Sequence, residues 1–471
     1  MRVGCTRIPV MNRLSPAQQA ALQSTFGERL SLRAADRASH GRDESFYAPA
    51  EPDAVLFAES VEDVQALVAW CHAERVPLIP FGAGTSLEGH VLAVQGGISL
   101  DLMRLNRILR IDAEDLSCSV EPGVTREQLN AALRDQGLFF PIDPGANASL
   151  GGMAATRASG TNAVRYGTLR ENVLGLHAVL PALGLIRAGS RAKKSSAGYD
   201  LARLLVGSEG TLGVITELTL KLHPLPEQVA AAAVQFPSVA AAVRTTIALV
   251  QSGVPIARCE LLDVHAVRAV NAHDGLGLAE APLLLLEFHG SASSVREQIE
   301  TVQACAAEQG GLQFAWAETP EARSKLWRAR HHAYWSALQS RPGCRCLTTD
   351  VCVPISRLAE AVETAVAAAE AAQQPHFIVG HVGDGNFHIG YLIDPARPEE
   401  LARAEALAAQ LVQLALALEG TCSGEHGVGL HKQGFLLQEA GAPAVAAMRA
   451  IKAALDPHGV MNPGKIFSRQ G

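Results

Sequence analysis

Two histidines flank a sequence that is typical of a tight β-hairpin. In residues 378–391, apolar residues lie on both sides of Asp384-Gly385, a dipeptide that favours a two-residue turn. With that turn, His381 faces His388 across the two strands, and their Cβ atoms are about 4.5–5.5 Å apart. Both rings could then bind one divalent metal ion. The alternative is that they are two polar residues on an exposed face of the hairpin.

A carboxylate and a third histidine follow in the sequence Ser423-Gly-Glu-His-Gly-Val-Gly429. Glu425 could complete a set of two histidines and one glutamate, which leaves coordination positions open as catalytic zinc sites do. Nitrogen and oxygen ligands suit Zn²⁺ or Mn²⁺. Asn386 lies inside the predicted turn, and we interpret it as a turn former rather than as a ligand.

Two arginines could bind an anionic substrate. Arg328 and Arg330 lie in residues 326–332, and a guanidinium group can bind a carboxylate through two N–H groups at once. Because the two arginines are two positions apart, they point in different directions on a helix. The residues alone do not choose between them.

Four loops between residues 80 and 213 are rich in glycine and other small residues. Such loops can present successive backbone N–H groups to a phosphate, and they let a ligand approach the backbone closely. None of them is Gly-x-Gly-x-x-Gly or a P-loop, so neither a Rossmann dinucleotide site nor an NTPase is supported. One such loop could be an ordinary turn, but four together favour a large flat cofactor that contains a pyrophosphate. The loops are 80–89, 144–152, 158–163 and 207–213.

The composition indicates a folded protein whose partner is a small molecule. The 471 residues carry a formal net charge of −7 and are 48% hydrophobic, and this length predicts two or three domains. The chain has no run of like charges, which argues against binding to nucleic acid or anionic lipid. The most apolar stretch, 401–418, is interrupted by polar residues, so it predicts an amphipathic helix and no transmembrane segment. Nine scattered cysteines indicate a reducing compartment.

The predicted elements that must position these residues mix helices with strands. A capping serine, Ser60, and a capping box that begins at Thr125 predict helices over 61–71 and 126–136. The prolines of 223–226 predict a domain boundary. Alanine-rich helical patterns then alternate with apolar strands up to about residue 420, which predicts a second α+β domain. The predicted strands are 76–80, 106–112, 116–121, 173–180, 185–187, 213–222, 283–288 and 377–382.

The start of the chain resembles a transit peptide only weakly. Arg2, Arg7 and Arg13 precede the first acidic residue, Glu28, and the stretch has no apolar segment of the kind that a secretory signal needs. We therefore interpret it as a disordered start. We expect a cytoplasmic protein, with organelle targeting as the alternative.

Long stretches of the chain resemble one known family. The loop at 80–89, residues 151–167, and residues 194–201 continuing through 207–216 closely resemble the FAD-binding domain of the vanillyl-alcohol oxidase (PCMH-type) superfamily. Within it, the chain is most similar to the group of D-lactate dehydrogenase (cytochrome), glycolate oxidase D-subunit and D-2-hydroxyglutarate dehydrogenase. The resemblance covers about residues 45–467.

This resemblance implies an α+β protein with a PCMH-type FAD-binding domain of two α/β subdomains and an α+β substrate (cap) domain. The implied parts are an N-terminal segment (1–45), the FAD-binding domain (46–225), the cap domain with the metal-site hairpin (226–420), and a C-terminal segment (421–471) that returns to the FAD-binding domain. One departure from the relatives is Pro181-Ala-Leu-Gly184, which stands where they usually carry a Pro-Asp-Gly turn.

The resemblance also implies that the glycine loops bind FAD. Residues 80–86 would hold the pyrophosphate, 144–152 and 160–167 would line the flavin, and 209–215 would contact the adenosine half. Some relatives attach the flavin to a histidine, but Thr85 occupies that place here, so the FAD is expected to be non-covalent. His90 is interpreted as a bystander. The implied cofactor-binding residues are Pro80, Gly82, Ala83, Gly84, Thr85, Ser86, Pro144, Gly145, Ala146, Leu150, Gly151, Gly152, Ala155, Gly160, Asn162, Gly167, Glu209, Gly210, Gly213, Val214, Ile215 and Asn462.

For the reaction itself, the resemblance matches His381, His388 and Glu425 to metal ligands. It matches His426 to the catalytic base and selects Arg330 for the substrate carboxylate. In relatives that act on hydroxyglutarate, a lysine before an Asp-x-x-x-Pro segment binds the second carboxylate. Residues 348–354 have no such lysine, which disfavours a dicarboxylate. The nearby cysteines 344, 346 and 352 resemble the D-lactate dehydrogenase subgroup and are interpreted as packing residues.

The implied activity is FAD- and metal-dependent oxidation of a D-2-hydroxy acid, D-lactate or a related monocarboxylate, with hydride transfer to flavin N5. Electrons would pass to a cytochrome, a quinone or an electron-transfer flavoprotein. Attachment to the periphery of the inner membrane and a homodimer are compatible with this activity. Three alternatives stay open: a flavoprotein subunit of a glycolate oxidase-like complex, a non-redox alkyl transferase on the same scaffold, and a metal hydrolase.

Overall fold

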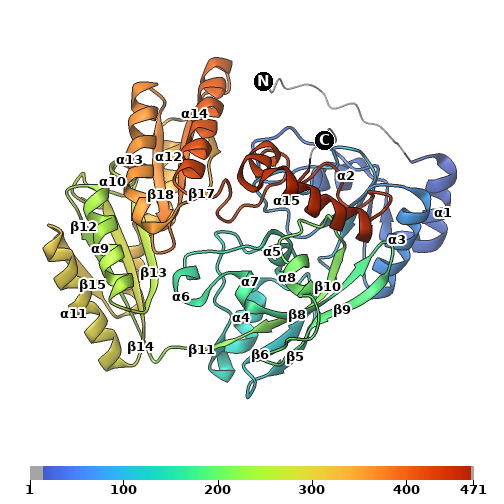
Figure 1. Cartoon of the computed structure of the whole chain (residues 1–471), viewed down its shortest axis with the longest axis horizontal. Coiled ribbons are helices and arrows are strands. Elements are labelled where there is room, and N and C mark those ends of the chain that lie inside the picture. Colours follow the sequence, from blue (N-terminus) through green and yellow to red (C-terminus); the bar gives the residue numbers. More distant parts are fainter. Residues whose placement is uncertain (1–13, 468–471) are drawn as a thin grey trace. The chain divides into compact units, whose positions relative to one another are not determined.

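The computed structural model describes residues 14–467, which divide into two compact units (Figure 1). Of the described residues, the first unit contains 14–159, 167–225 and 425–467. The second unit contains residues 160–166 and 226–424. Arg2, Arg7 and Arg13 lie outside the described residues.

The first unit contains a small, mainly parallel sheet with the order β1-β2-β4-β3. Helix α3 (Val61–Glu74) begins at Ser60, whose hydroxyl accepts a hydrogen bond from the Asp63 N–H, as predicted. Val64, Leu67 and Val68 recur at helical spacing and are buried in one core with the strands. The strands are β1 (Leu30–Ser31), β2 (Ala54–Phe57), β3 (Leu78–Phe81) and β4 (Ile98–Asp101).

An antiparallel sheet with the order β5-β6-β10-β8-β9 forms the rest of this unit's framework, together with a separate pair, β7 and β11. The predicted strand over 173–180 is confirmed without change. The predicted helix over 126–136 splits into α4 and a 3₁₀ turn, and Gly137 ends it at φ 68°. The strands are β5 (Ile108–Asp112), β6 (Ser117–Val120), β7 (Leu138–Phe139), β8 (Val173–Leu180), β9 (Gly184–Gly189), β10 (Val214–Lys221) and β11 (His223–Pro224).

The predicted disordered start is wrong for the part of it that the structure describes. Helix α1 (Pro16–Phe26) begins with a complete capping box between Ser15 and Gln18, and its Leu22 and Phe26 are buried. The burial of these two side chains stabilises a segment whose exposed face is polar. The other helices of the first unit are α2 (Ala34–His40), α4 (Arg126–Leu133), α5 (Leu150–Thr156), α7 (Leu169–Asn172), α8 (Leu201–Leu205) and α15 (Gln433–Leu455).

The second unit is built on one antiparallel sheet with the order β15-β12-β14-β13-β18-β19-β16, to which β17 adds by pairing with β19. Along each strand, successive side chains point to opposite faces of the sheet. The strands are β12 (Gln228–Gln235), β13 (Ile256–Leu262), β14 (Leu283–Gly290), β15 (Leu312–Ala317), β16 (Arg345–Thr348), β17 (Val351–Cys352), β18 (His376–His381) and β19 (Asn386–Ile393).

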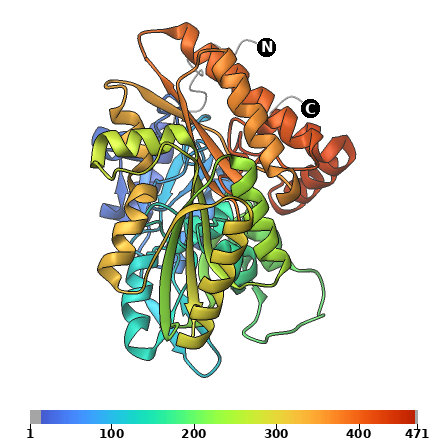
Figure 2. The ribbon, with the colours of Figure 1, turned by 90° about the vertical axis from the view of Figure 1, so that its left-hand side faces the viewer.

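Helices cover both faces of this sheet (Figures 1 and 2). Ala231, Ala233 and Leu285 pack with α10 and α12 in one core, and α9 and α11 contact β12, β13 and β14. This arrangement confirms the predicted α+β class. Among residues 14–467, none of the helices combines the length and the hydrophobicity that a membrane span needs. The helices are α6 (Ala163–Tyr166), α9 (Val239–Gln251), α10 (Val264–Asp274), α11 (Ala292–Glu308), α12 (Pro320–Gln339), α13 (Leu358–Ala371) and α14 (Pro398–Ala417).

Candidate active site

The hairpin that carries His381 and His388 is formed by β18 and β19, but its register differs from the predicted one. His381 pairs with Asn386, and His388 pairs with Val379. The turn therefore contains the four residues 382–385, and the predicted pairing of 381 with 388 is wrong. Strand β17 and the residue after it explain the difference, because β17 pairs with the start of β19 and the Val353 N–H donates to the Gly385 carbonyl (3.1 Å).

The two histidines nevertheless lie on the same face of the sheet. The register is shifted by two positions, and side chains repeat with a period of two, so the shift leaves the face unchanged. The ring centroids of His381 and His388 are 5.4 Å apart, and the ring planes are inclined by 82°. Both side chains are buried. The hairpin thus brings together two imidazoles, as predicted, but through diagonal neighbours rather than a directly opposed pair.

Glu260, on the adjacent strand β13, binds two of the predicted site residues at once. Its carboxylate accepts a hydrogen bond from His381 Nδ1 (2.6 Å) and another from Arg330 Nε (2.7 Å), and Glu260 is fully buried. Burial acts to raise the pKa of Glu260, but the charges of His381 and Arg330 outweigh it and hold that pKa below its ordinary value. With Nδ1–H donated to the carboxylate, Nε2 is the His381 nitrogen that could bind a metal ion.

His388 is oriented in the same way by a different acceptor. Its Nδ1 donates to the Thr349 carbonyl (3.0 Å), which again leaves Nε2 to bind a metal ion. The Asp350 carboxylate lies 3.8 Å from the same Nδ1. Asn386 begins β19 instead of forming the turn, and its amide donates to Asp350 (2.9 Å) and to the Val351 carbonyl (2.8 Å).

The segment that leads to Glu425 and His426 is anchored beside this hairpin. The Ser423 hydroxyl donates to Asp350 (3.1 Å), and a Cβ atom at Gly424 would overlap the amide of Asn386. Only glycine fits at position 424 for this reason. Glu425 is the next residue along the chain, and consecutive Cα atoms are about 3.8 Å apart. Glu425 and His426 themselves belong to the first unit.

The first glycine loop of the first unit has the chemistry of an anion cradle. Among residues 14–467, no protein acceptor receives a hydrogen bond from the backbone N–H groups of residues 82–86. Gly84 adopts φ 68°, a conformation that favours glycine, and a Cβ atom at Gly82 would force the Ser149 hydroxyl to move. Five successive N–H groups without an internal partner suit a pyrophosphate.

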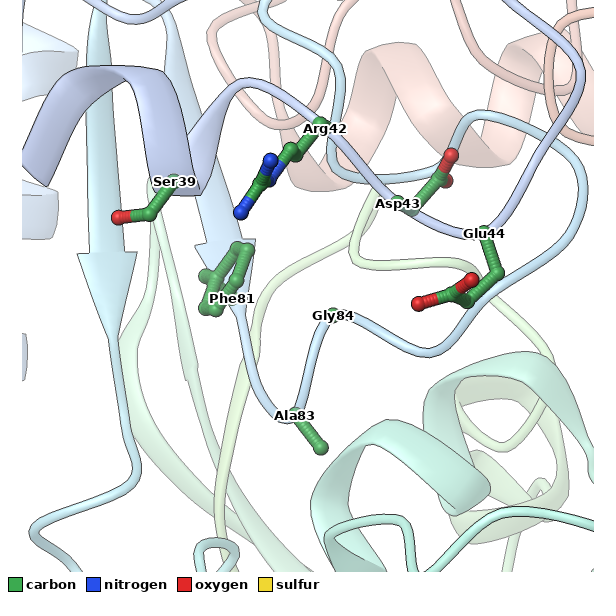
Figure 3. A pocket seen from close by; sticks show the side chains of 7 residues that line it. All are labelled: Ser39, Arg42, Asp43, Glu44, Phe81, Ala83 and Gly84. Carbon is green, nitrogen blue, oxygen red and sulfur yellow. The ribbon is translucent and has the colours of Figure 1, made fainter. Parts of the chain in front are cut away.

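A pocket beside this loop contains a cation that the sequence analysis missed. Ser39, Arg42, Asp43, Glu44, Phe81, Ala83 and Gly84 line it, and in Figure 3 the Arg42 guanidinium lies next to Phe81 at the start of the loop. The Ser86 hydroxyl donates to Asp43 (2.9 Å), so this hydroxyl supports the loop instead of pointing at a phosphate. A guanidinium next to unpartnered N–H groups favours an anionic ligand.

Glu209 holds the loop that follows His426. Its carboxylate accepts hydrogen bonds from the backbone N–H groups of Val428 (2.7 Å) and Gly429 (2.9 Å) and lies 3.2 Å from His90 Nε2. Burial acts to raise the pKa of Glu209, but His90 and these N–H groups outweigh it and lower that pKa. Burial acts to lower the pKa of His90, and Glu209 outweighs it and raises that pKa. His90, which we interpreted as a bystander, is therefore one of the groups that support this loop.

The C-terminal segment joins the same network. The Asn462 amide donates to the carbonyls of His90 (3.0 Å) and Glu209 (2.8 Å), and the Asn462 N–H donates to the Leu78 carbonyl. Lys465 donates to the Leu92 carbonyl, and burial lowers its pKa to about 7. Glu209 and Asn462 both have positive φ, at 53° and 39°, a conformation that costs a non-glycine residue roughly 1–2 kcal/mol.

The other predicted cofactor loops fall into different units. Gly151 lies against Pro122 so closely that a Cβ atom would collide with the proline ring, and its N–H donates to the Pro122 carbonyl (2.8 Å). Residues 160–166 belong to the second unit, where Asn162 accepts a hydrogen bond from Arg258 (3.1 Å). The roles of both loops in binding a cofactor stay predictions.

The sequence did not lead us to Glu260 or Arg42 as functional candidates, and it did not predict that His90 contacts Glu209. Glu260 lies in strand Ile256–Leu262, where it and Arg258 are the two charged residues, and charged residues in a strand that is otherwise apolar were the available signal. Nothing local to Arg42 or His90 pointed to these contacts, because Phe81 is 39 positions from Arg42 and Glu209 is 119 positions from His90.

Comparisons with known proteins extend over nearly the whole chain. Residues 52–189 match the family described as "FAD binding domain", and residues 225–466 match "FAD linked oxidases, C-terminal domain". A "Probable D-lactate dehydrogenase, mitochondrial" of Danio rerio is 49% identical over 94% of this chain and 90% of that protein. A "D-lactate dehydrogenase [cytochrome], mitochondrial" of Arabidopsis thaliana is 43% identical over 95% of this chain and 79% of that protein. The structure of p-cresol methylhydroxylase is similar in fold, with a TM-score of 0.79, 17% identity, and coverage of 97% of this chain and 98% of that one.

Proposed function

The chain belongs to the FAD linked oxidases, as its sequence resemblance predicted, and from this premise we propose that it oxidises a D-2-hydroxy acid, D-lactate or a related monocarboxylate, to the 2-oxo acid. The names of its relatives support the substrate class. The observation that carries the proposal is the contact of Glu260 with both His381 and Arg330, because it joins a potential metal ligand to a carboxylate-binding cation.

FAD is the cofactor of this family, and when bound it supplies the acceptor for the hydride that leaves the substrate Cα. The N–H groups of residues 82–86 would hold its pyrophosphate, with Arg42 beside them. Thr85 cannot form the histidyl link found in some relatives, so the FAD is non-covalent. Acid precipitation should release all of the flavin into the supernatant, and flavin fluorescence that stayed with the precipitated chain would contradict this.

His381, His388 and Glu425 would hold a divalent ion, Zn²⁺ or Mn²⁺. Both histidines present Nε2 because a buried acceptor takes their Nδ1–H, which is the arrangement that metal-binding histidines use. Gly424 packs on Asn386, so the chain delivers Glu425 from a point that is fixed beside the hairpin. The ion would polarise the substrate hydroxyl.

His426 and Arg330 would act on the substrate directly. Arg330 donates through Nε to Glu260, which leaves the N–H groups of its two terminal nitrogens to grip a carboxylate through two hydrogen bonds. His426 would accept the proton of the substrate hydroxyl as general base. The segment 348–350 is Thr-Thr-Asp and carries no cation for a second carboxylate, so a monocarboxylate is favoured.

The electron acceptor and the cellular location are part of the same proposal. The words "cytochrome" and "mitochondrial" in the names of relatives support a cytochrome acceptor and an organelle over the cytoplasmic location that we expected. The alkyl-transferase alternative shares the fold, but the combination of two histidines, a glutamate and Arg330 favours the dehydrogenase.

A panel of 2-hydroxy acids with a dye acceptor tests the proposed function. The purified protein, loaded with FAD and Zn²⁺ or Mn²⁺, should reduce the dye with D-lactate or D-2-hydroxybutyrate and not with L-lactate. D-2-hydroxyglutarate should give a lower kcat/KM than D-lactate. Absence of turnover with every D-hydroxy acid, in protein that carries bound FAD, would contradict the proposal.

A further inference from the structure

A second cluster of potential metal ligands lies in the second unit, at the opposite end of β18 from His381. Asp263 precedes α10, His265 lies in the first turn of that helix, and His376 begins β18. One potential ligand atom from each of these three residues lies within 4.8 Å of the other two. The proposed reaction uses none of these residues.

The hydrogen bonds of His376 leave one nitrogen without a partner. Nδ1 lies 2.9 Å from the Gln374 carbonyl, which can only accept, so Nδ1 carries the proton. Nε2 then carries a lone pair, and this atom is buried without a hydrogen-bond partner among residues 14–467. A buried nitrogen lone pair that meets no donor is costly unless a cation or water satisfies it.

His265 is prepared in the same way and faces His376. Its Nδ1 donates to the Asp263 carboxylate (3.0 Å), which leaves Nε2 as the nitrogen with the lone pair when the ring is neutral. The two ring centroids are 4.5 Å apart. The His265 side chain is 26% exposed, so an ion can reach the cluster from solvent.

Asp263 is held rigidly by the elements that the cluster joins. One carboxylate oxygen accepts hydrogen bonds from the backbone N–H groups of Ala266 (2.8 Å) and Ile378 (3.0 Å), which fixes it to both α10 and β18. The other oxygen holds His265. A carboxylate that orients a histidine whose far nitrogen is available is the usual outer shell of a metal-binding histidine.

We propose that His265 and His376, supported by Asp263, bind a second transition-metal ion, separate from the one proposed at His381 and His388. Two imidazole nitrogens, one of them oriented by the Asp263 carboxylate, suit Zn²⁺, Cu²⁺ or Ni²⁺ and not Mg²⁺ or Ca²⁺, which require mainly oxygen ligands. The ion joins the first turn of α10 to the start of β18. Its binding therefore stabilises the second unit, because an ion that binds only the folded state shifts the unfolding equilibrium.

Zinc binding to the apoprotein tests this site. After treatment with a chelator, bound Zn²⁺ is counted by metal analysis and titrated by calorimetry in the wild type and in His376→Gln and His265→Gln. Each variant should bind one Zn²⁺ fewer per chain than the wild type, and Zn²⁺ should raise its thermal unfolding temperature less. Asp263→Asn should weaken binding at this site by roughly 10–100-fold.

Two controls distinguish this site from the proposed catalytic metal site and from weak, non-specific binding of Zn²⁺ to other histidines. The double variant His381→Ala/His388→Ala should retain the ion at His376, whether or not the catalytic metal exists. His72→Gln disrupts another close pair, in which His72 stacks on His458 with ring centroids 4.3 Å apart, and it should leave the zinc count unchanged. A His376→Gln protein that binds as much Zn²⁺ as the wild type, with the same affinity, would overturn the proposal.

Discussion

Glu209 in the first unit and Glu260 in the second are both buried, both lie beside a histidine, and both have a lowered pKa. They differ in what they hold. Glu209 binds the backbone N–H groups of Val428 and Gly429, whereas Glu260 binds the side chains of His381 and Arg330. A buried carboxylate fixes the path of a loop in the first unit, and in the second it fixes two side chains that we propose bind the metal ion and the substrate. Removing each should therefore damage a different property.

The largest effect is expected for His426, which lies just before the loop that Glu209 binds. His426→Ala should lower kcat by about 10²–10⁴-fold, because a general base is lost, and should retain bound metal and FAD. Anaerobic bleaching of the flavin by D-lactate measures this step. A variant that bleaches at the wild-type rate would end the proposed role of His426. As the converse, His381→Ala and His388→Ala should lose the ion.

Glu260→Gln should disturb the orientation of the His381 and Arg330 side chains without unfolding the second unit. The amide cannot accept hydrogen bonds from both His381 and Arg330, so metal affinity should fall by roughly 10–100-fold and KM for D-lactate should rise. Glu287→Gln is the matched control: Glu287 is buried on neighbouring strand β14 and binds His289 (2.9 Å), which is not a proposed ligand. Equal losses of metal in both variants would mean that the effect comes from general damage to the sheet.

Glu209→Gln should instead act on the loop. The side-chain amide leaves one of the two buried backbone N–H groups unsatisfied, which should cost about 1–3 kcal/mol in the free energy of unfolding. Turnover should fall while the metal content stays at the wild-type level, because the hairpin histidines are untouched. Urea denaturation and steady-state kinetics measure the two effects. Reduced stability with unchanged kcat would confine Glu209 to a folding role.

The smallest effect concerns pH. Glu209 has a lowered pKa, so its stabilisation is present above its ordinary pKa of about 4.3 and is lost as the pH falls below that value. His90 has a raised pKa, so its stabilisation is complete below about pH 6.5 and is lost as the pH rises through the raised value. His90→Gln should therefore be more destabilising at pH 5.5 than at pH 9. A difference in unfolding free energy that does not change with pH would show that the pair is not ionised.

Local signals predicted elements well, and long-range contacts account for the errors. The Ser60 cap and the apolar run over 173–180 lie within the elements they define, and both predictions are confirmed. The predicted two-residue turn is wrong. Asp384-Gly385 favours such a turn in isolation, but in the structure β17 pairs with β19 and the turn contains four residues. The capping box at Ser15 was a local signal that the sequence analysis overlooked.

The candidate site shows the same division. His381 and His388 could be found because both flank one turn, within eight residues of each other. Glu260 could not be linked to them, since it is 121 positions from His381 and 70 from Arg330. Buried ionic contacts of this kind depend on the packing of distant strands, which no local pattern specifies.

The attachment of the C-terminal segment to β3 constrains how the chain can be made. Leu78 forms a parallel bridge with Met461, and its N–H and carbonyl both bond to that segment. The first unit therefore cannot complete its parallel sheet until residue 461 has left the ribosome. At about 5–20 residues per second, synthesis of the intervening second unit delays that event by tens of seconds. During this interval the edge of β3 is unpaired, and an unpaired strand edge is a template for pairing with other chains.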